Sequence, residues 1–252
     1  MSPPPSSMVA FLAYRTVVTP NLLSIRAHDI FQRSAPLCGG RTAGRRPERL
    51  SMHDFSSSVY WNKVYTSGKD ESGQQAVSEW HVEGKVFARE LQRLLGDPSA
   101  PDGSERAILN IGCGTSTLWE SVYDLGWRSI TNIDFSEPCI ERGRRSLSSH
   151  SRPGVRWLVM DACTLTLDDA SFDAAIDKGT LDAIACSEGF DWFLPRMARS
   201  IVRVLRPGGT WVCVSFTSPE IVLPLLEECK GWDVDVEKLQ SFWMYVGRKK
   251  NH

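Results

Sequence analysis

The 252-residue sequence contains no apolar run close to the roughly 20 residues that a helix needs to cross a bilayer, so it predicts no membrane-spanning segment. Its seven cysteines are scattered, with no C-x-x-C pair and no histidine at ligand spacing. This distribution predicts neither a metal site nor a disulfide framework, and it is typical of a protein from a reducing compartment.

The first 50 residues have no lysine and only two acidic residues, Asp29 and Glu48, beside seven arginines. A Pro/Ser stretch opens this segment, a Gly/Arg-rich stretch closes it, and residues 22–33 between them fit an amphipathic helix. An arginine-rich, acid-poor composition is typical of an organelle-import presequence. We predict mitochondrial import. The alternatives are a plastid signal, a plain disordered leader, or a cytoplasmic chain whose functional part begins at Met52.

The leader contributes +5 to a net charge of −1, which leaves −6 for residues 51–252. A net-acidic body argues against sequence-independent binding of nucleic acid, which needs a basic surface. We therefore expect no nucleic-acid partner, and we expect residues 51–252 to form one domain behind the leader. The sequence does not define an oligomeric state.

Four short apolar runs in residues 107–177 have the pattern of strands buried on both faces of a parallel sheet. Each run stops at a glycine turn or an aspartate. Because the carboxyl ends of parallel strands line one crevice, these endings should converge on one ligand. The endings are Gly112 to Gly114, Asp134, Asp161 and Asp177.

Strand-like and helical patterns alternate along residues 59–229, and two strand-like runs then follow without a helix between them. This order predicts a doubly wound, seven-stranded, mostly parallel α/β sheet with a C-terminal antiparallel hairpin. The expected strands are 107–111, 129–134, 155–160, 172–177, 210–216, 232–239 and 241–248. The expected helices are 59–64, 78–95, 117–125, 138–148, 192–204 and 219–229.

The strand endings favour a nucleoside without phosphates. Thr117 stands where a dinucleotide fold has its third glycine, which weakens the case for NAD. A carboxylate at Asp134 suits the two hydroxyls of a ribose, and Asp161 can accept from an adenine amino group. No residues are arranged to neutralise phosphates, so we predict S-adenosylmethionine as the cofactor.

The chain from Tyr60 onward resembles the class I S-adenosylmethionine-dependent methyltransferases. It looks most like the eukaryotic methyltransferase-like protein-lysine methyltransferases that modify elongation factor 1-alpha or mitochondrial citrate synthase. One departure is His81, where that family usually has an aromatic residue. The motifs that carry the resemblance are YWNKVY, SEW, IGCGTS, DLGWRSITNIDFS, MDAC, SFDAAIDKGTLDAI and RVLRPGG.

The glycine turn is expected to bind the methionyl part of the cofactor. Gly112 and Gly114 let the backbone approach it, because a β-carbon at either position would block the contact. The backbone amides of Thr115 and Ser116, at the start of a helix, can receive its carboxylate.

The next two strand ends are expected to bind the nucleoside. Asp134 would accept from the ribose hydroxyls while Phe135 packs on the adenine. Asp161 would accept from the adenine amino group, with Ala162 beside it. The alternative for each aspartate is a helix cap or a turn.

The acceptor side is expected at the fourth strand end. A lysine amine must lose a proton before it can attack, and Asp177 is predicted to orient it and accept that proton. Trp80 is predicted to line the channel or the methionyl end. Lys178 is expected to pair with an acid at the surface, His81 to be solvated on a helix, and Trp61 to lie in the core.

The resemblance implies methyl transfer from S-adenosylmethionine to a lysine ε-amine of another protein. Two alternatives stay open. One is a small-molecule methyltransferase, and the other is a catalytically silent, cofactor-binding partner subunit.

Overall fold

The computed structural model describes residues 57–68, 79–100, 105–146 and 150–251, together with Phe55 and Gly103. The predicted leader and its boundary with the domain lie outside the described residues. In the part of the chain that is described, no helix has the length and apolar character needed to span a membrane.

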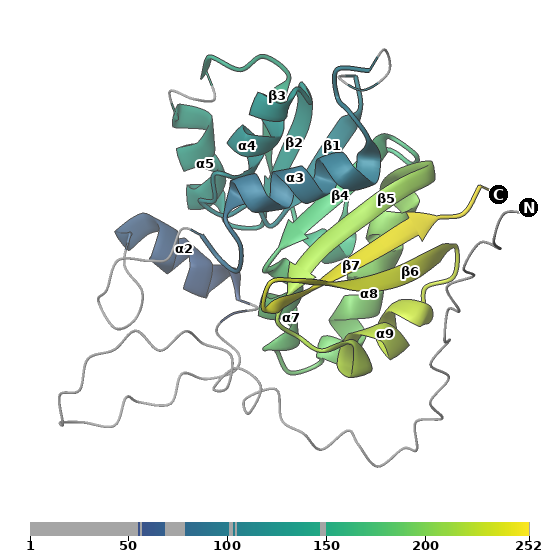
Figure 1. Ribbon diagram of the computed structural model, residues 1–252. Coiled ribbons are helices and arrows are strands. Elements are labelled where there is room, and N and C mark those ends of the chain that lie inside the picture. Colours follow the sequence, from purple (N-terminus) through teal and green to yellow (C-terminus); the bar gives the residue numbers. More distant parts are fainter. Residues whose placement is uncertain are drawn as a thin grey trace, which may run out of the picture. The chain divides into compact units, whose positions relative to one another are not determined.

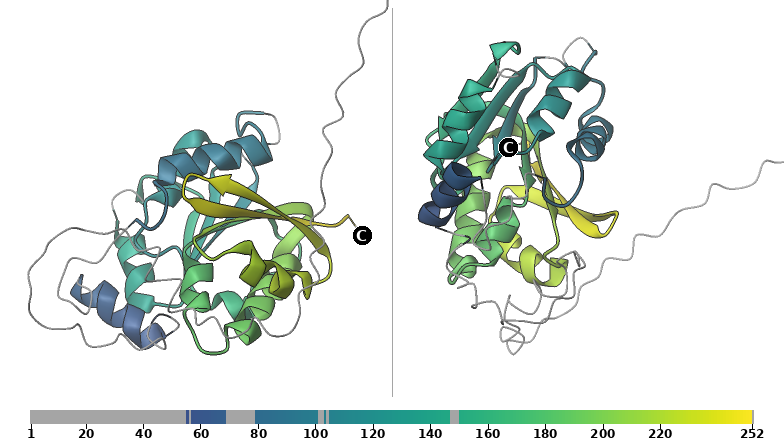
Figure 2. Two further views of the ribbon diagram at one scale, coloured as in Figure 1. Left: turned by 60° about the horizontal axis from the view of Figure 1, so that its bottom comes forward. Right: turned by 90° about the vertical axis from the view of Figure 1, so that its left-hand side faces the viewer.

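The predicted seven-stranded sheet is confirmed, with the strand order β3-β2-β1-β4-β5-β7-β6. β1 to β5 run parallel, and β7 pairs antiparallel with both β5 and β6. Figure 1 and the turned views of Figure 2 show the β6–β7 hairpin at one edge of the sheet. The strands are β1 Ala107–Ile111, β2 Ser129–Asp134, β3 Val155–Val159, β4 Phe172–Lys178, β5 Leu205–Ser215, β6 Trp232–Leu239 and β7 Phe242–Lys249.

Helices cover both faces of the sheet, because alternate residues of its strands belong to two separate apolar clusters. One cluster packs the sheet against α3, α4 and α5, and the other packs it against α7, α8 and α9. The helices are α2 Ser58–Ser67, α3 Gly84–Leu95, α4 Leu118–Leu125, α5 Glu137–Arg145, α7 Thr180–Ala185, α8 Phe190–Val204 and α9 Pro219–Glu227, with a short 3₁₀ turn, η1, at Ala162–Thr164.

The sheet register aligns the four strand ends that the sequence singled out. Ile111, the last residue of β1, pairs with Ile133 on one side and with Asp177 on the other. Asp134 at the end of β2 pairs with Val159 of β3. The glycine turn and the three aspartates therefore lie side by side at the carboxyl ends of the parallel strands.

The helix predicted for residues 78–95 is shorter, and it begins only at Gly84. His81 has a φ of +65°, a left-handed conformation that no α-helix contains. The carbonyls of Trp80 and Val82 accept hydrogen bonds from the side chain of Lys178 instead of from the next helical turn. A contact with a distant strand thus prevents the helix from starting earlier.

The sequence analysis missed α7, a helix of six residues inside the DKGTLDAI motif. So short a helix shows no measurable 3.6-residue periodicity. It begins after Gly179, whose φ of +102° turns the chain sharply out of β4.

Candidate active site

The glycine turn after β1 is held in a conformation that favours glycine. Gly112 and Gly114 have φ values of +54° and +51°. A β-carbon on Gly112 would collide with the side chain of Thr180, whose hydroxyl donates to the carbonyl of Ile111 at 3.0 Å. A β-carbon on Gly114 would lie 3.0 Å from the hydroxyl of Tyr65. Close neighbours on both sides thus require glycine here.

Asp134 joins the glycine turn to the end of β2. Its carboxylate accepts from the amide of Gly114 at 3.0 Å and from the amide of Ser136 at 2.9 Å, one bond on each oxygen. Burial raises the pKa of Asp134, whereas these amide bonds act to lower it. The Cys139 thiol is a further hydrogen-bond donor to this carboxylate, and the lone pairs that remain suit the hydroxyls of a ribose.

The end of β3 lies beside the end of β2, since the amide of Met160 donates to the carbonyl of Asp134 at 2.9 Å. Asp161 is exposed and caps η1 by accepting from the amide of Cys163 at 2.8 Å. Ala162 is buried, and Phe135 is half-buried. Asp161 thus caps η1 and is still exposed to solvent, and this geometry does not test the predicted contact with the adenine. That contact stays a prediction.

Asp177 is fully buried, unlike the exposed Asp161. Its two oxygens accept from the amides of Thr180 at 2.9 Å and Leu181 at 3.2 Å, so it caps α7. Burial raises the pKa of Asp177 to about 7, with the charge of Asp182 adding to the rise and the amide bonds opposing it. This geometry supports α7 and offers no surface to an incoming amine, so it does not support the predicted contact.

Lys178 pairs with an acid, as expected, but not at the surface. Because side chains alternate along β4, Lys178 points away from Asp177 toward the segment before α3. Its ammonium is buried and donates to the carboxylate of Glu79 and to the carbonyls of Trp80 and Val82. This residue therefore ties residues 79–82 to the end of β4.

Glu79 is a site residue that the sequence analysis passed over, although it stands in the SEW motif. Its carboxylate also accepts from the hydroxyl of Ser116 at 3.0 Å and from the amide of Thr117 at 2.7 Å. Burial acts to raise the pKa of Glu79, but the bonds from Lys178 and Thr117 outweigh it and lower that pKa. Glu79 thus links the start of α4 to the end of β4. The predicted role of the Thr115 and Ser116 amides stays a prediction.

His81 is not the solvated helix residue that we expected. Its side chain is 2% exposed, and its Nε2 is hydrogen-bonded to Asp182 of α7. The ring stacks on Phe216 with centroids 5.5 Å apart and tilts against Phe242 at 5.0 Å. No local pattern indicates this pair, because its two members are 101 residues apart in the sequence.

Asp182 is held from several directions. One of its oxygens accepts from the hydroxyls of Ser215 and Thr217, and its other oxygen faces His81. The signal in the sequence for this residue is its place as the second acid of the DKGTLD motif, which the short helix α7 brings back beside the end of β4. Asp182 is thereby fixed as an acceptor behind the His81 ring.

Aromatic side chains of α2 pack against Trp80 and lie beside the glycine turn. Trp61 is half-buried rather than in the core, and its ring stacks on Tyr65 at 5.5 Å. Trp80 is also half-buried and meets Trp61 edge to face at 6.4 Å. Tyr65 was missed as a site residue, and the spacing of aromatic residues in YWNKVY is the signal that could have indicated it.

One group of three potential metal ligands exists among the described residues. Cys113, Asp134 and Cys139 place ligand atoms within 4.8 Å of one another. Burial raises the pKa of the Cys113 thiol, and both Asp134 oxygens already accept amides. A metal needs thiolate ligands, and the raised pKa opposes the thiolate form of Cys113, so this cluster does not favour a metal.

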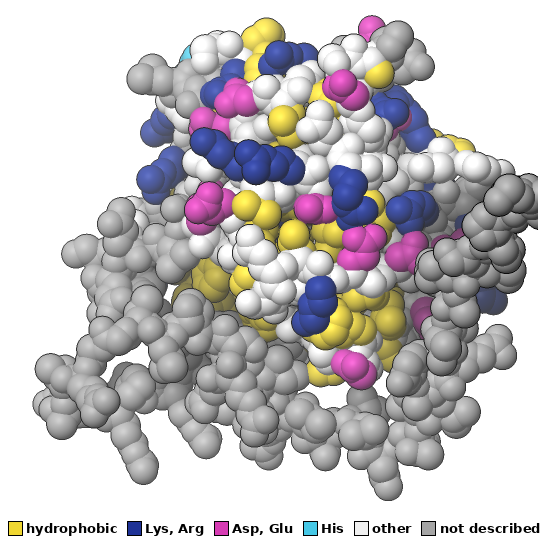
Figure 3. Space-filling model, viewed as in Figure 1, with side chains coloured by type: hydrophobic (Ala, Val, Ile, Leu, Met, Phe, Trp, Pro, Cys, Tyr) yellow, Lys and Arg dark blue, Asp and Glu magenta, His cyan; other side chains and the backbone are white. Residues whose placement is uncertain are grey.

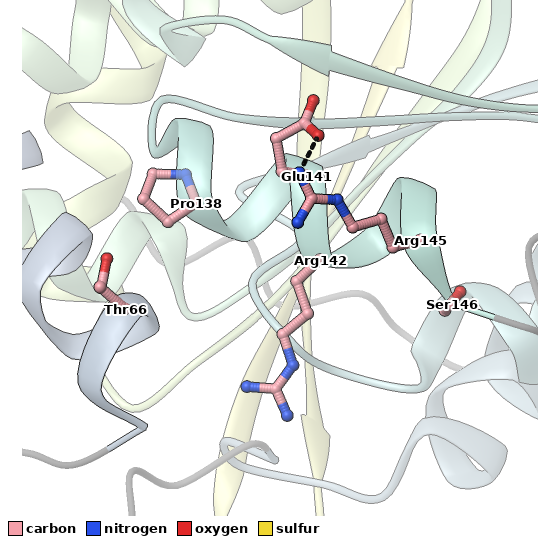
Figure 4. Close-up of a pocket in the computed structure, with 6 residues that line it drawn as sticks. All are labelled: Thr66, Pro138, Glu141, Arg142, Arg145 and Ser146. Atoms are coloured by element: carbon pink, nitrogen blue, oxygen red, sulfur yellow. Dashed lines mark hydrogen bonds and ion pairs between the residues drawn. The ribbon is translucent and has the colours of Figure 1, made fainter.

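A pocket of about 560 Å³ lies between α2 and α5. It is lined by Thr66, Pro138, Glu141, Arg142, Arg145 and Ser146. Figure 4 shows the ion pair between Glu141 and Arg145, and the Arg142 side chain extending in another direction. None of the predicted site residues lines this pocket.

Comparisons with known proteins identify the family. Residues 109–213 match the methyltransferase domain family. The chain is similar to the eEF1A lysine and N-terminal methyltransferases of Homo sapiens (34% identity over 195 residues, 76% of this chain and 26% of that protein) and Danio rerio (32% over 190 residues, 75% and 26%). It therefore spans about a quarter of the length of these relatives. It is also similar to methyltransferase srdJ of Neurospora crassa (30% over 172 residues, 66% and 69%).

Solved structures agree on the fold. The [4+2]-cyclase SpnF superposes with a TM-score of 0.57 at 18% identity, covering 79% of this chain and 98% of that one. A phosphoethanolamine N-methyltransferase of Haemonchus contortus gives 0.57 at 14% identity, covering 82% and 62%.

The residues at the strand ends fit the cofactor of this family. Gly112 and Gly114 have no β-carbons, and Asp134 beside the turn has lone pairs that suit a ribose. Fold, family match and strand-end chemistry agree. The chain therefore belongs to the class I methyltransferases and uses S-adenosylmethionine as its cofactor.

Proposed function

We propose that the chain methylates a lysine ε-amine of a protein. The observation that carries this proposal is its similarity to the eEF1A lysine and N-terminal methyltransferases over 76% of its length. Because the chain spans about a quarter of those relatives, the target protein stays part of the proposal.

We propose the following cofactor contacts. The turn formed by Gly112 and Gly114, with the amides of Thr115 and Ser116, would hold the methionyl part. Two further groups would hold the nucleoside, namely Asp134 with Phe135 at the ribose and Asp161 with Ala162 at the adenine. What supports these roles is the alignment of the strand ends along one sheet edge.

The acceptor side would lie at the end of β4. S-adenosylmethionine supplies an electrophilic methyl group on a sulfonium, so the chain has to supply position and a route for the proton of the amine. Trp80 borders this end, because its β-carbon lies 3.6 Å from where a side chain on Gly179 would begin. Asp177 would act indirectly here, by capping α7 and so placing Gly179 and Asp182.

The test is methyl transfer from labelled S-adenosylmethionine by the full chain, with separated cytosolic and mitochondrial extracts as acceptors. We expect a labelled protein band, and mass spectrometry should place the label on a lysine side chain. Label on an N-terminal α-amine would instead assign the second activity in the relatives' name.

The matched control is Asp134→Asn, which removes charge at the proposed ribose contact without changing shape. Loss of the band in this variant shows that the labelling depends on the cofactor site. Label only on small molecules would establish the small-molecule alternative. Cofactor binding without any transfer, in either extract, would establish the silent-subunit alternative.

We also propose a protein acceptor rather than a nucleic acid. Among the described residues on the face in Figure 3, Lys and Arg side chains are interspersed with Asp and Glu side chains. That distribution gives no continuous basic surface on this face, in keeping with the net charge of −6 outside the leader.

Mitochondrial import is proposed from the composition of the leader, with the cytoplasm as the alternative. Expression with a C-terminal tag, followed by fractionation and N-terminal sequencing, tests it. A shortened chain in the mitochondrial fraction supports import, and a full-length chain in the cytosol contradicts it.

A further inference from the structure

We propose that His81, backed by Asp182, accepts the proton of the target amine. The inference rests on the proposed transfer to an amine, and it assigns to this chain a proton acceptor that the sequence had placed at Asp177. It starts from three observations on His81: its backbone conformation, its bond to Asp182, and the space beside its ring.

The backbone at His81 is in the left-handed region, which non-glycine residues seldom adopt. The two bonds from Lys178 to the carbonyls of Trp80 and Val82 hold the chain on either side of it. Residues 80–82, which precede α3, are thus held beside the end of β4, and from there the side chain of His81 reaches Asp182 on α7.

The bond to Asp182 defines the tautomer of His81. An ionised carboxylate is an acceptor only, so Nε2 must carry the proton, and Nδ1 of the neutral ring then has a free lone pair. Asp182 is itself fixed by the hydroxyls of Ser215 and Thr217. It can therefore stabilise the imidazolium that forms when Nδ1 takes a proton.

The free edge of the ring faces Gly179. A β-carbon built on Gly179 would lie 3.5 Å from Cε1 and 3.9 Å from Nδ1 of His81, which are ordinary contact distances. The missing side chain therefore leaves a space the size of a methyl or an amino group beside Nδ1. Within the described part of the chain, no residue is recorded as a partner of Nδ1.

His81 is better placed for this role than Asp177. Both side chains are buried, but both oxygens of Asp177 already accept backbone amides, whereas the bond of His81 to Asp182 uses Nε2 and leaves Nδ1 for the amine. Other titratable groups surround the pair and will shape any pH profile. Those near His81 are Glu79 and Lys178, and those near Asp182 are Asp177, Cys186, Cys213 and Tyr245.

One N–H bond of the target ammonium breaks, its proton passes to Nδ1, and the electron pair stays on nitrogen. The amine then forms a C–N bond to the methyl carbon as the C–S bond breaks and its pair goes to sulfur. Because a lysine is only about one thousandth neutral at pH 7.4, its deprotonation costs roughly 4 kcal/mol, and a base beside the amine provides the route by which the proton leaves.

The test uses the full chain with two substitutions at one position. In His81→Gln the side-chain amide can still donate to Asp182 but cannot accept a proton near neutral pH, and His81→Phe keeps a ring between Phe216 and Phe242. We expect both variants to bind S-adenosylmethionine within about threefold of wild type. We expect kcat at pH 7.5 to fall by about 10²-fold or more and to rise with pH, because the amine must then lose its proton to solvent.

A kcat within about threefold of wild type for His81→Gln across pH 6.5–9 would overturn the proposal. A second measurement does not depend on any acceptor: the ring ¹⁵N spectrum of the full chain, with His81 assigned from the His81→Gln variant. A proton on Nε2 and none on Nδ1 at pH 8 supports the proposal, and a proton on Nδ1 overturns it. If the wild-type protein labels no lysine but its spectrum shows the expected tautomer of His81, the proposed function is refuted and the assignment of the tautomer is not.

Discussion

Replacing Asp177 by Asn should change how the stability of the protein depends on pH. The carboxyl is fully buried, and its pKa is raised from 3.8 to about 7. The native state therefore keeps this proton up to about pH 7, whereas the unfolded chain loses it near pH 4. Between these values the unfolded state binds fewer protons, so the free energy of unfolding falls as the pH rises.

The size of the effect follows from the same two pKa values. A difference of about three units corresponds to roughly 4 kcal/mol, lost by the wild type between about pH 4 and pH 7 and constant above that. Asn cannot titrate, so the Asp177→Asn variant lacks this loss. It carries instead a pH-independent cost of about 1–3 kcal/mol, because its NH₂ group cannot accept from the amide of Thr180 or Leu181.

The assay is urea unfolding of both proteins at intervals from pH 4.5 to pH 8. The stability of the wild type relative to the variant should fall by several kcal/mol across this range. The control is Asp161→Asn, which removes a carboxylate from an exposed cap at a neighbouring strand end. A difference that stays constant, or that grows with pH, would refute the reasoning.

The same variant tests the role that the sequence suggested for Asp177. If this residue only supports α7, Asp177→Asn keeps most of its turnover at pH 8. Collapse of turnover in a folded variant that still binds cofactor would restore Asp177 as a contact of the target amine.

Three further changes have defined outcomes. Asp134→Asn should weaken S-adenosylmethionine binding by about 1–3 kcal/mol in calorimetry while leaving the fold intact, and an unchanged Kd would exclude the ribose contact. Lys178→Met should lower the melting temperature and loosen residues 79–82, because it removes the buried donor to Glu79, Trp80 and Val82; unchanged amide exchange there would contradict this. Gly179→Ala should reduce kcat more than cofactor affinity. The φ of +102° at this position is strained for alanine, and the new methyl group would fill the space beside His81. Wild-type kinetics in this variant would show that the space is unused.

Local patterns were enough to predict the sheet. The bounds of β1, β2 and β6 agree with the expected strands, because buried apolar runs ending at a polar residue carry their own boundaries. The start of β5 was misplaced. The strand begins at Leu205 rather than Thr210, because Leu205 pairs with Phe172 of β4, and the RPGG residues form an irregularity before pairing resumes at Thr210. Such pairing leaves no periodic signal in the sequence.

The sequence by itself determined the fold class, the cofactor and the strand ends that converge on one edge, because each depends on residues close together in the chain. Only the tertiary structure decided what the residues at the fourth strand end do. Alternation along β4 sends Asp177 into the cap of α7 and Lys178 to the segment before α3, and the turn at Gly179 returns Asp182 to His81. Hydrogen bonds across about 100 residues of chain fix the roles of Lys178 and Asp182, and no local pattern encodes them.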